Sequence, residues 1–202
     1  MASKLVVSTF VSLDGVMQGP GGAGEDDSNG FPHGGWLPPH VDEDFGRIMG
    51  EVLESADGML LGRKSYDILN SYWPNVPDEE GAAQINGMPK YVTTRSPMEA
   101  TWRNTHVLVG EAAQTVAEVK RTTDGVLLVQ GSSDLIRTLQ GADLIDEYRL
   151  LIFPVVLGQG KRLFAEGTTP AGLKLTGSST TGAGVIHVRY EPQGKPAYGA
   201  VA

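Results

Sequence analysis

A glycine followed by two cations, at Gly62, Arg63 and Lys64, comes directly after a short apolar run. A glycine lets a phosphate approach the backbone closely, and the free amides that open a following helix attract anions. Arginine and lysine would add positive charge at the same place. The segment therefore predicts contact with the phosphates of a nucleotide, although a solvated basic turn has the same composition.

A second candidate segment, formed by Thr94, Arg95 and Ser96, holds two hydroxyls and a guanidinium just past another expected strand. An arginine can bind a phosphate in bidentate fashion, and a basic residue here could recognise the additional 2′-phosphate of NADP. The simpler interpretation is an ordinary exit from a strand into a loop.

A third candidate segment begins at Gln130 and ends at Asp134. Within it, Gly131 would permit the close approach of a ligand. Ser132 or Ser133 could cap a helix whose free amides hold a pyrophosphate. A serine-capped helix that binds no ligand also fits these residues.

Two carboxylates are candidates for proton transfer to a substrate. Asp14 follows the first expected strand, and Asp44 stands in the first turn of the first expected helix. A carboxylate in a closed pocket can have a raised pKa and can relay a proton to a ring nitrogen. However, Asp14 precedes a glycine, which is an ordinary turn signal, and an acid in a first helical turn complements the helix dipole.

Three aromatic side chains, those of Trp36, Tyr66 and Phe153, could stack on a flat heterocyclic substrate. Aromatic residues beside apolar strands are more often part of a hydrophobic core, and this alternative is strongest for Phe153, which lies within an apolar run.

Composition excludes several classes of protein. The 202 residues include no cysteine, which rules out disulfides, thiolate metal sites and iron–sulfur clusters. The four histidines are scattered, so we expect no zinc site. The net charge of -8 disfavours binding to nucleic acid or membranes, and no apolar run approaches the ~20 residues of a membrane span. We expect a soluble, cytoplasmic protein with one domain over residues 1–192 and a flexible tail over 193–202.

Alternating strands and helices must position these candidate residues. Strands are expected over Lys4–Ser12, 57–61, Lys90–Thr94, 106–109, 125–130 and 147–156, followed by a hairpin of 173–179 and 185–190. Helices are expected over 42–55, 63–69, 77–85, 111–120 and 133–140. This alternation predicts an α/β fold with a mostly parallel sheet, helices on both faces and an antiparallel C-terminal hairpin. Ligands of such sheets bind beyond the carboxyl ends of the strands.

The segment over residues 15–39 is rich in glycine and proline and long for a loop without structure. Its Gly19–Gly24 stretch matches the glycine spacing of a dinucleotide-binding fingerprint. No helical pattern follows it, so we expect a flexible loop here and not a phosphate-binding turn. The segment could close over a site as a lid, or it could be a solvated linker.

The candidate segments occur in a recognisable order, together with Ser12-Leu13-Asp14-Gly15 and the stretch 153–160. In this order and spacing the chain resembles the dihydrofolate-reductase-like superfamily. The resemblance is closest to the branch related to the reductase domain of riboflavin biosynthesis, and it extends from about residue 4 to 190.

This resemblance implies a three-layer dihydrofolate-reductase-like fold, a homodimer and an NADPH cofactor bound by the three candidate segments. Asp14 and the turn that begins with Leu157 and Gly158 would border the nicotinamide and a small-molecule substrate. The implied reaction is hydride transfer to a C=N or C=O bond of a pterin-like or pyrimidine-like heterocycle.

Two positions depart from the riboflavin-pathway pattern. Val16 stands where a basic residue is usual, and Gln130 stands where a glutamate is usual. Three functions therefore stay open. They are a general NADPH-dependent reductase, a 5-amino-6-(5-phosphoribosylamino)uracil reductase, and a non-catalytic NADP-binding protein.

Overall fold

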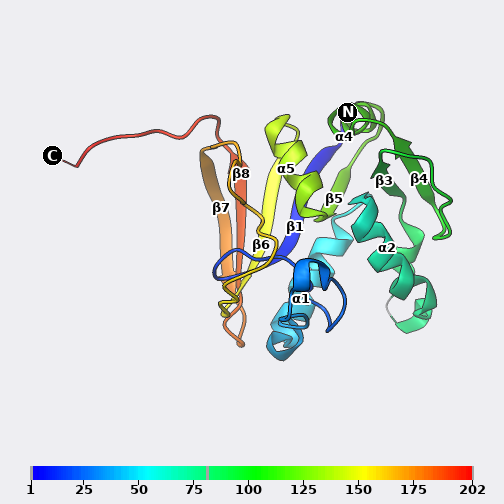
Figure 1. Ribbon diagram of the computed structural model, residues 1–202, viewed down its shortest axis with the longest axis horizontal. Helices are drawn as coiled ribbons and strands as arrows, with labels where there is room; N and C mark the ends of the chain where they lie inside the picture. Colours follow the sequence, from blue (N-terminus) through cyan, green and yellow to red (C-terminus); the bar gives the residue numbers. More distant parts are fainter. Residues whose placement is uncertain (1, 81, 202) are drawn as a thin grey trace.

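Eight strands form one sheet in the order β4-β3-β2-β5-β1-β6-β8-β7 (Figure 1). The computed structural model describes residues 2–80 and 82–201, so that Met1, Gly81 and Ala202 lie outside the described residues. The strands are β1 (Lys4–Ser12), β2 (Gly58–Gly62), β3 (Lys90–Thr94), β4 (Thr105–Val109), β5 (Val126–Gly131), β6 (Glu147–Phe153), β7 (Leu173–Thr180) and β8 (Ile186–Pro192). Pairing is parallel from β4 to β6, whereas β8 and β7 add an antiparallel edge.

The helices are α1 (Glu43–Glu54), α2 (Arg63–Tyr72), α3 (Ala83–Gly87), α4 (Ala112–Thr122) and α5 (Ser133–Gly141). Single 3-10 turns lie at Ser28–Gly30, Pro38–His40, Trp73–Asn75 and Asp78–Glu80. None of the helices in the described part of the chain is long and apolar enough to cross a membrane.

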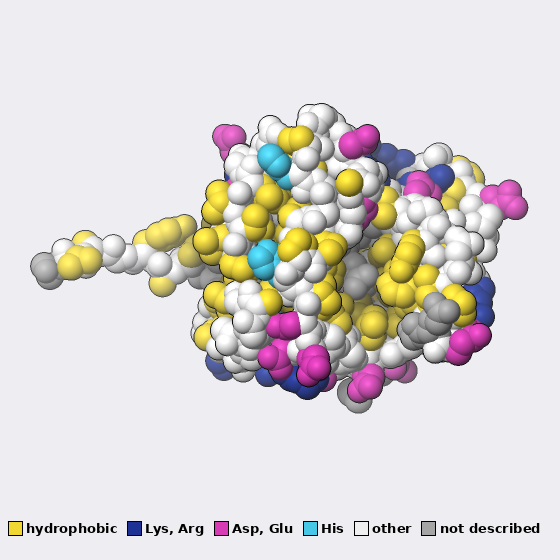
Figure 2. Space-filling view, turned by 90° about the horizontal axis from the view of Figure 1, so that it is seen from below, with side chains coloured by type: hydrophobic (Ala, Val, Ile, Leu, Met, Phe, Trp, Pro, Cys, Tyr) yellow, Lys and Arg dark blue, Asp and Glu magenta, His cyan; other side chains and the backbone are white. Residues whose placement is uncertain are grey.

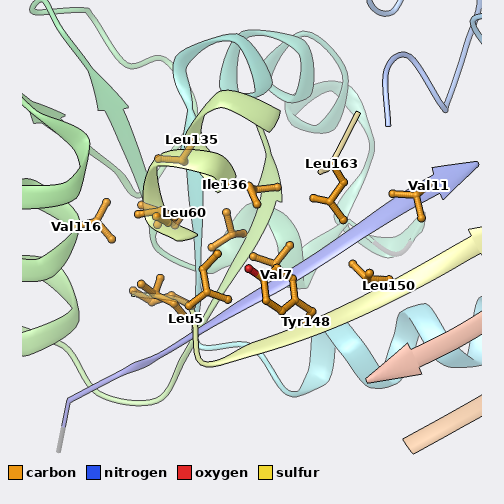
Figure 3. Packing of buried hydrophobic residues seen from close by; sticks show 14 of the residues in the cluster. Leu5, Val7, Val11, Leu60, Val116, Leu135, Ile136, Tyr148, Leu150 and Leu163 are labelled. Carbon is orange, nitrogen blue, oxygen red and sulfur yellow. The ribbon is translucent and has the colours of Figure 1, made fainter. Parts of the chain in front are cut away.

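Alternate side chains of β1 build a core on each face of the sheet. Leu5 and Val7 pack into a cluster with α4 and α5 (Figure 3), whereas Val6 packs on the opposite face against α1. Because successive side chains of a strand point to opposite faces, a strand covered on both sides is apolar throughout. These layers confirm the predicted α/β fold with a mostly parallel sheet and helices on both faces.

Helix α1 shows how the sequence fixes one of these layers. Its buried side chains are Phe45, Ile48 and Val52, which recur at helical spacing on one face. The Asp42 carboxylate accepts a hydrogen bond from the Phe45 amide at 2.8 Å and so caps the helix.

The region after α2 differs from the prediction. Helix α2 continues to Tyr72, beyond the expected end at residue 69. The exposed helix expected over 77–85 is wrong, because the chain forms a 3-10 turn and then the short α3, with Gly81 outside the described residues. Ile85 of α3 is buried in a third cluster with Met59 and Trp102, so tertiary packing places this segment.

The chain differs from the prediction at the end of β6 and just after β8. Strand β6 ends at Phe153 because Pro154 has no amide hydrogen to donate. Gln193 and Gly194 still form backbone hydrogen bonds with Gly172, both at 2.7 Å, where the prediction placed the start of a flexible tail. Beyond them the chain extends away from the sheet in two perpendicular views (Figures 1 and 2).

Candidate active site

The three candidate phosphate segments come together at one edge of the sheet. Strands β3, β2 and β5 are parallel neighbours, so their carboxyl ends lie side by side. A pocket of about 410 Å³ opens there, which we call the turn pocket. Residues from all three segments line it, namely Gly62, Arg63, Thr94, Arg95, Ser96, Ser132 and Asp134.

Close backbone approach requires two glycines beside this pocket. A Cβ atom on Gly62 would lie 2.6 Å from Ser132 Oγ, and one on Gly131 would lie 2.6 Å from Ser65 Oγ. The Gly131–Ser132 peptide bond is cis. The end of β2 thus packs closely against Ser132 because Gly62 carries no side chain, and Gly131 packs closely against Ser65 at the start of α2.

Two helices begin at these strand ends. The Ser132 hydroxyl accepts a hydrogen bond from the Leu135 amide at 3.4 Å and caps α5. Helix α2 begins after Gly62, and no side chain of the described residues caps it. Helix N-termini carry unpaired amides and a partial positive charge, so both suit an anion.

The cations near the turn pocket differ in their availability. Arg63 pairs with Asp67 at 2.9 Å on the exposed surface of α2. Arg95 is exposed, and no carboxylate in the described ranges pairs with it. Its guanidinium is therefore available to a phosphate at this end of the site.

A second cavity, of about 190 Å³, lies on the other side of Ser132 and Asp134, which line both spaces. We call it the loop cavity, because the segment 15–39 forms one wall. Its other walls come from β1, α2 and the end of β5, and its lining includes Gln130, Gly131, Ser133 and Lys161.

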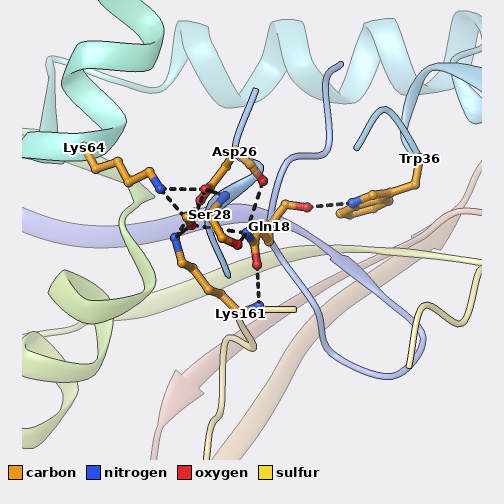
Figure 4. Close-up of polar contacts among 6 residues, drawn as sticks. All are labelled: Gln18, Asp26, Ser28, Trp36, Lys64 and Lys161. Carbon is orange, nitrogen blue, oxygen red and sulfur yellow. Dashed lines mark hydrogen bonds and ion pairs between the residues drawn. The ribbon is translucent and has the colours of Figure 1, made fainter. Parts of the chain in front are cut away.

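The segment 15–39 is held by its own hydrogen bonds (Figure 4). The buried Gln18 side chain donates to the Asp26 and Ser28 carbonyl oxygens, at 3.1 and 3.0 Å, and accepts from the Lys161 amide at 3.0 Å. The Trp36 indole donates to the Gln18 carbonyl at 2.9 Å. The segment is thus a folded loop that forms a wall of the cavity.

Asp26 joins this loop to two other parts of the site. Its carboxylate pairs with Lys64 of α2 at 2.5 Å and with Lys161 at 2.7 Å (Figure 4). Burial alone would raise the pKa of Asp26, but hydrogen bonds from Lys161, Lys64 and Ser28 outweigh it and hold that pKa well below its usual range. Lys64 is one of the predicted phosphate ligands, and in this structure it binds the loop.

Asp14 lies outside the lining of both spaces, and its contacts do not fit proton transfer. Its carboxylate accepts from the Ser12 hydroxyl at 2.7 Å and from the amides of Leu157 and Gly158 at 3.1 and 2.9 Å. Arg162 binds both its carboxylate and its carbonyl oxygen. The Ser12 hydroxyl and these amides hold the pKa of Asp14 well below its usual range, so the group stays ionised. Asp14, Leu157 and Gly158 thus secure a turn to the end of β1.

Asp44 also lies away from both spaces. It pairs with Arg47 one turn later at 3.2 Å and accepts a hydrogen bond from the Gly182 amide at 3.3 Å. These contacts join the start of α1 to the turn between β7 and β8. The expectation that Asp44 serves catalysis has no support in this geometry.

The three aromatic candidates belong to cores and line neither space. Phe153 is completely buried, and the Trp36 ring meets its edge with centroids 5.3 Å apart. Tyr66 is 1 % exposed, and its hydroxyl accepts from the amides of Thr101 and Trp102, each at 3.1 Å. Their predicted stacking on a substrate is corrected here, since their rings already pack against protein.

The sequence prediction missed several groups of the loop cavity. Ser8 and Thr9 of β1 line it, as do Glu25 of the loop and Lys161. The sequence offers one signal for Ser8 and Thr9, namely two hydroxyls inside an otherwise apolar buried strand. The others depend on how the loop folds, which no local pattern reveals.

Comparisons with known proteins agree with this architecture. A family model described as the RibD C-terminal domain matches residues 3–187. The uncharacterized protein YyaP of Bacillus subtilis strain 168 is 29% identical over 199 residues, which cover 95% of this chain and 96% of that protein. The uncharacterized protein YwjB of the same organism is 30% identical over 188 residues, which cover 92% and 96% of the two chains.

Solved structures share the fold at lower identity. A protein assigned to riboflavin biosynthesis from Shewanella sp. PV-4 has a TM-score of 0.68 at 22% identity, covering 96% of this chain and 99% of that one. A Thermotoga maritima diaminohydroxyphosphoribosylaminopyrimidine deaminase/5-amino-6-(5-phosphoribosylamino)uracil reductase has a TM-score of 0.62 at 14% identity, covering 95% and 57%. Dihydrofolate reductase from Enterococcus faecalis, complexed with NADP(H), has a TM-score of 0.59 at 14% identity, covering 96% and 99%.

Proposed function

Because the chain belongs to the RibD C-terminal domain family, we propose that it is an NADPH-dependent reductase acting on a C=N or C=O bond of a small heterocycle. The observation that carries this proposal is the turn pocket, where three phosphate-type segments meet beside a second cavity. The shared wall at Ser132 and Asp134 would let one extended ligand reach from the turn pocket to a substrate in the loop cavity.

The residues of the turn pocket fit a dinucleotide. Gly62 and Gly131 let the neighbouring segments at Ser132 and Ser65 pack closely against them, which brings the beginnings of α2 and α5 together beside the pocket. The amides that begin α2 and α5 would bind its oxygens, and Arg95 would bind the 2′-phosphate that distinguishes NADPH from NADH. The bound cofactor supplies the hydride, while the chain orients it and excludes water.

The loop cavity would hold the reacting ring of the substrate. The volume of the loop cavity is about 190 Å³, which is smaller than the ~300 Å³ of a usual ligand pocket. A cavity of this size suits one or two small rings. Phe10, Ile68 and Leu69 offer apolar surface to such a ring, and hydroxyl and carboxyl groups lie between them.

Titration of the purified protein with NADPH and NADH, followed by ligand fluorescence, tests the proposal. We expect NADPH to bind at least tenfold more tightly than NADH. If neither ligand binds, the reductase proposal fails, and equal affinities would remove the role given to Arg95. A panel of pterins, pyrimidines and quinones then tests turnover, and NADPH binding without any oxidation would favour a non-catalytic NADP-binding protein.

The same panel should include 5-amino-6-(5-phosphoribosylamino)uracil. Val16 is buried and apolar where a basic residue is usual, so this position offers no cation to the ribose phosphate of that substrate. We therefore expect a phosphate-free heterocycle to be reduced more efficiently. The opposite preference would support the riboflavin-pathway alternative.

We also propose that the protein is a homodimer whose second copy covers the β7–β8 edge. Leu175 and Ile186 are 52% and 39% exposed there, and β7 is the last strand of the sheet. Apolar side chains are visible on the face shown in Figure 2, with acidic groups mostly toward its rim. Light scattering after size exclusion should give twice the chain mass, and Leu175→Lys should halve it. A monomeric wild-type protein would exclude this proposal.

A further inference from the structure

The loop cavity is lined by two residues of β1 whose side-chain hydroxyls have no protein partner. Ser8 and Thr9 are 3% and 4% exposed, and both line the cavity. Neither side chain forms a hydrogen bond within residues 2–80 and 82–201. Buried polar groups are almost always hydrogen-bonded, so these hydroxyls suit the polar atoms of a ligand.

Glu25 places a carboxyl group in the wall of the same cavity. One of its oxygens, Oε2, accepts hydrogen bonds from the amides of Gly21 and Gly22, at 2.5 and 3.1 Å. The other oxygen, Oε1, has no partner among the described residues. The amides thus fix the side chain on the loop while leaving one oxygen available to a ligand.

The other carboxylates that line this cavity are already neutralised. Asp26 pairs with Lys64 and Lys161, and Asp134 pairs with Arg137 at 2.8 Å. Glu25 has no cation partner in the part of the chain that the structure describes. It is therefore the lining carboxyl group best suited to carry a proton.

The surroundings of Glu25 favour its protonated form. Burial raises the pKa of Glu25 above its usual value, and the neighbouring Asp26 adds to this, while the two amide hydrogen bonds oppose it. Lys64 and Lys161 also face the cavity, but both are engaged by Asp26, which weakens their effect on Glu25.

We propose that Glu25 is the proton donor for the reduction, with one β1 hydroxyl, that of Ser8 or Thr9, orienting the substrate beside it. This inference rests on the proposed function, from which NADPH is the hydride source. The substrate carbon receives the hydride, and the electron pair of the C=N or C=O bond moves to the heteroatom. That atom takes the proton from Glu25 Oε1, leaving a carboxylate that the Gly21 and Gly22 amides stabilise. A proton from solvent then restores the acid.

Glu25→Gln tests the inference, because glutamine has the same size and keeps an oxygen for the Gly21 and Gly22 amides. With the best substrate of the pterin, pyrimidine and quinone panel, we expect kcat to fall about 100-fold, while KM and NADPH affinity change less than about twofold. Wild-type kcat should fall as the pH rises through the pKa of Glu25, and this dependence should disappear in the variant. Near-normal kcat in Glu25→Gln would show that Glu25 serves only the loop.

A second measurement is independent of turnover. Carboxyl-carbon NMR of the protein labelled in glutamate, with Glu25→Gln for assignment, should show Glu25 titrating above the ordinary glutamate value of about 4.3. An ordinary or lower pKa would overturn the inference even if the protein is an NADPH-dependent reductase. Conversely, failure of the NADPH titration would reject the proposed function itself. Glu54→Gln, on the exposed side of α1, is the matched control and should leave kcat unchanged.

Discussion

The turn pocket and the loop cavity share a wall, yet the chain builds them in different ways. The turn pocket is lined by residues at the ends of neighbouring parallel strands and in the helices that follow them, so local sequence and strand order largely determine it. The loop cavity depends on contacts between distant residues, such as the bond from the Lys161 amide to Gln18, which lie 143 positions apart. The proposed nucleotide-binding part thus depends mainly on local sequence, whereas the cavity beside it depends on long-range contacts.

The largest expected effect comes from disrupting the close contact between Gly62 and Ser132 beside the turn pocket. Gly62→Ala places a Cβ atom 2.6 Å from Ser132 Oγ and 3.1 Å from its amide nitrogen. We expect NADPH affinity to fall about 100-fold or more and the free energy of unfolding to fall by about 1–3 kcal/mol, because the β2 and β5 ends must separate. Titration and urea denaturation measure both.

Gly46→Ala on α1 is the matched control, since its Cβ atom would meet nothing within 4 Å. Alanine stabilises a helix relative to glycine, so this variant should bind NADPH normally and unfold at slightly higher urea concentration. If the two variants have equal NADPH affinity and equal stability to urea, the turn pocket does not depend on the close contact between Gly62 and Ser132.

Arg95→Gln should have the next largest effect. Loss of its guanidinium should weaken NADPH binding about 10- to 30-fold and leave NADH binding unchanged, because the two cofactors differ by one phosphate. Fluorescence titration with both cofactors gives the ratio directly. An equal loss for NADPH and NADH would indicate that Arg95 contacts a part common to both.

Asp26→Asn should disturb the loop cavity while sparing the turn pocket. It removes the charge that holds Lys64 and Lys161, whose side chains are 46% and 32% exposed, so the cost is a modest ~1 kcal/mol in the free energy of unfolding. We expect faster proteolysis within 15–39 and unchanged NADPH affinity. If NADPH affinity instead falls together with loop protection, the two parts of the site are energetically coupled.

The pH dependence of this effect has a definite sign. The folded-state pKa of Asp26 is lowered, so its ion pairs stabilise the protein above the ordinary aspartate value of about 3.9 and lose this contribution as the pH falls toward the folded-state value. Urea denaturation of wild type and Asp26→Asn should therefore differ by a constant amount from pH 7 to about 5. The difference should shrink below about pH 4.

The smallest expected effect is that of Asp44→Asn. The Asp44 carboxylate contacts Arg47 and the Gly182 amide, and it lies outside both spaces of the site. We expect kcat and NADPH affinity to stay within about twofold of wild type, since an exposed ion pair contributes little. A large loss of kcat would restore Asp44 as a catalytic candidate.

The sequence predicts the sheet well where burial alone decides the structure. The bounds of β1 and β3 agree with the expected strands. β1 is mostly apolar because it is covered on both faces, whereas β3 carries the β-branched and aromatic residues that are common in strands. The meeting of Gly62, Thr94 and Gly131 also follows from the parallel strand order. By contrast, the α3 region depends on the burial of Ile85 against other elements, so its local pattern misleads.

The functional side chains were harder to predict, for a physical reason. Periodicity shows that a residue such as Tyr66 lies near a strand end, but not whether its ring faces a ligand or packs in the core. The acidic residues Asp14, Glu25 and Asp26 have similar sequence surroundings, rich in glycine and other loop-forming residues. Only their three-dimensional partners distinguish a turn anchor from an ion-pair bridge and a partly unpaired carboxyl group.

The place of β1 in the sheet sets the order in which the protein can fold. Strand β1, which is synthesised before the other strands of this sheet, lies between β5 and β6, with Lys4 beside Val126 and Val6 beside Glu147. It therefore gains neither neighbour until most of the chain has been synthesised. Such long-range pairing slows folding and leaves an apolar segment exposed to aggregation in the meantime. Nascent chains that stop before Val126 should thus depend on chaperones to stay soluble.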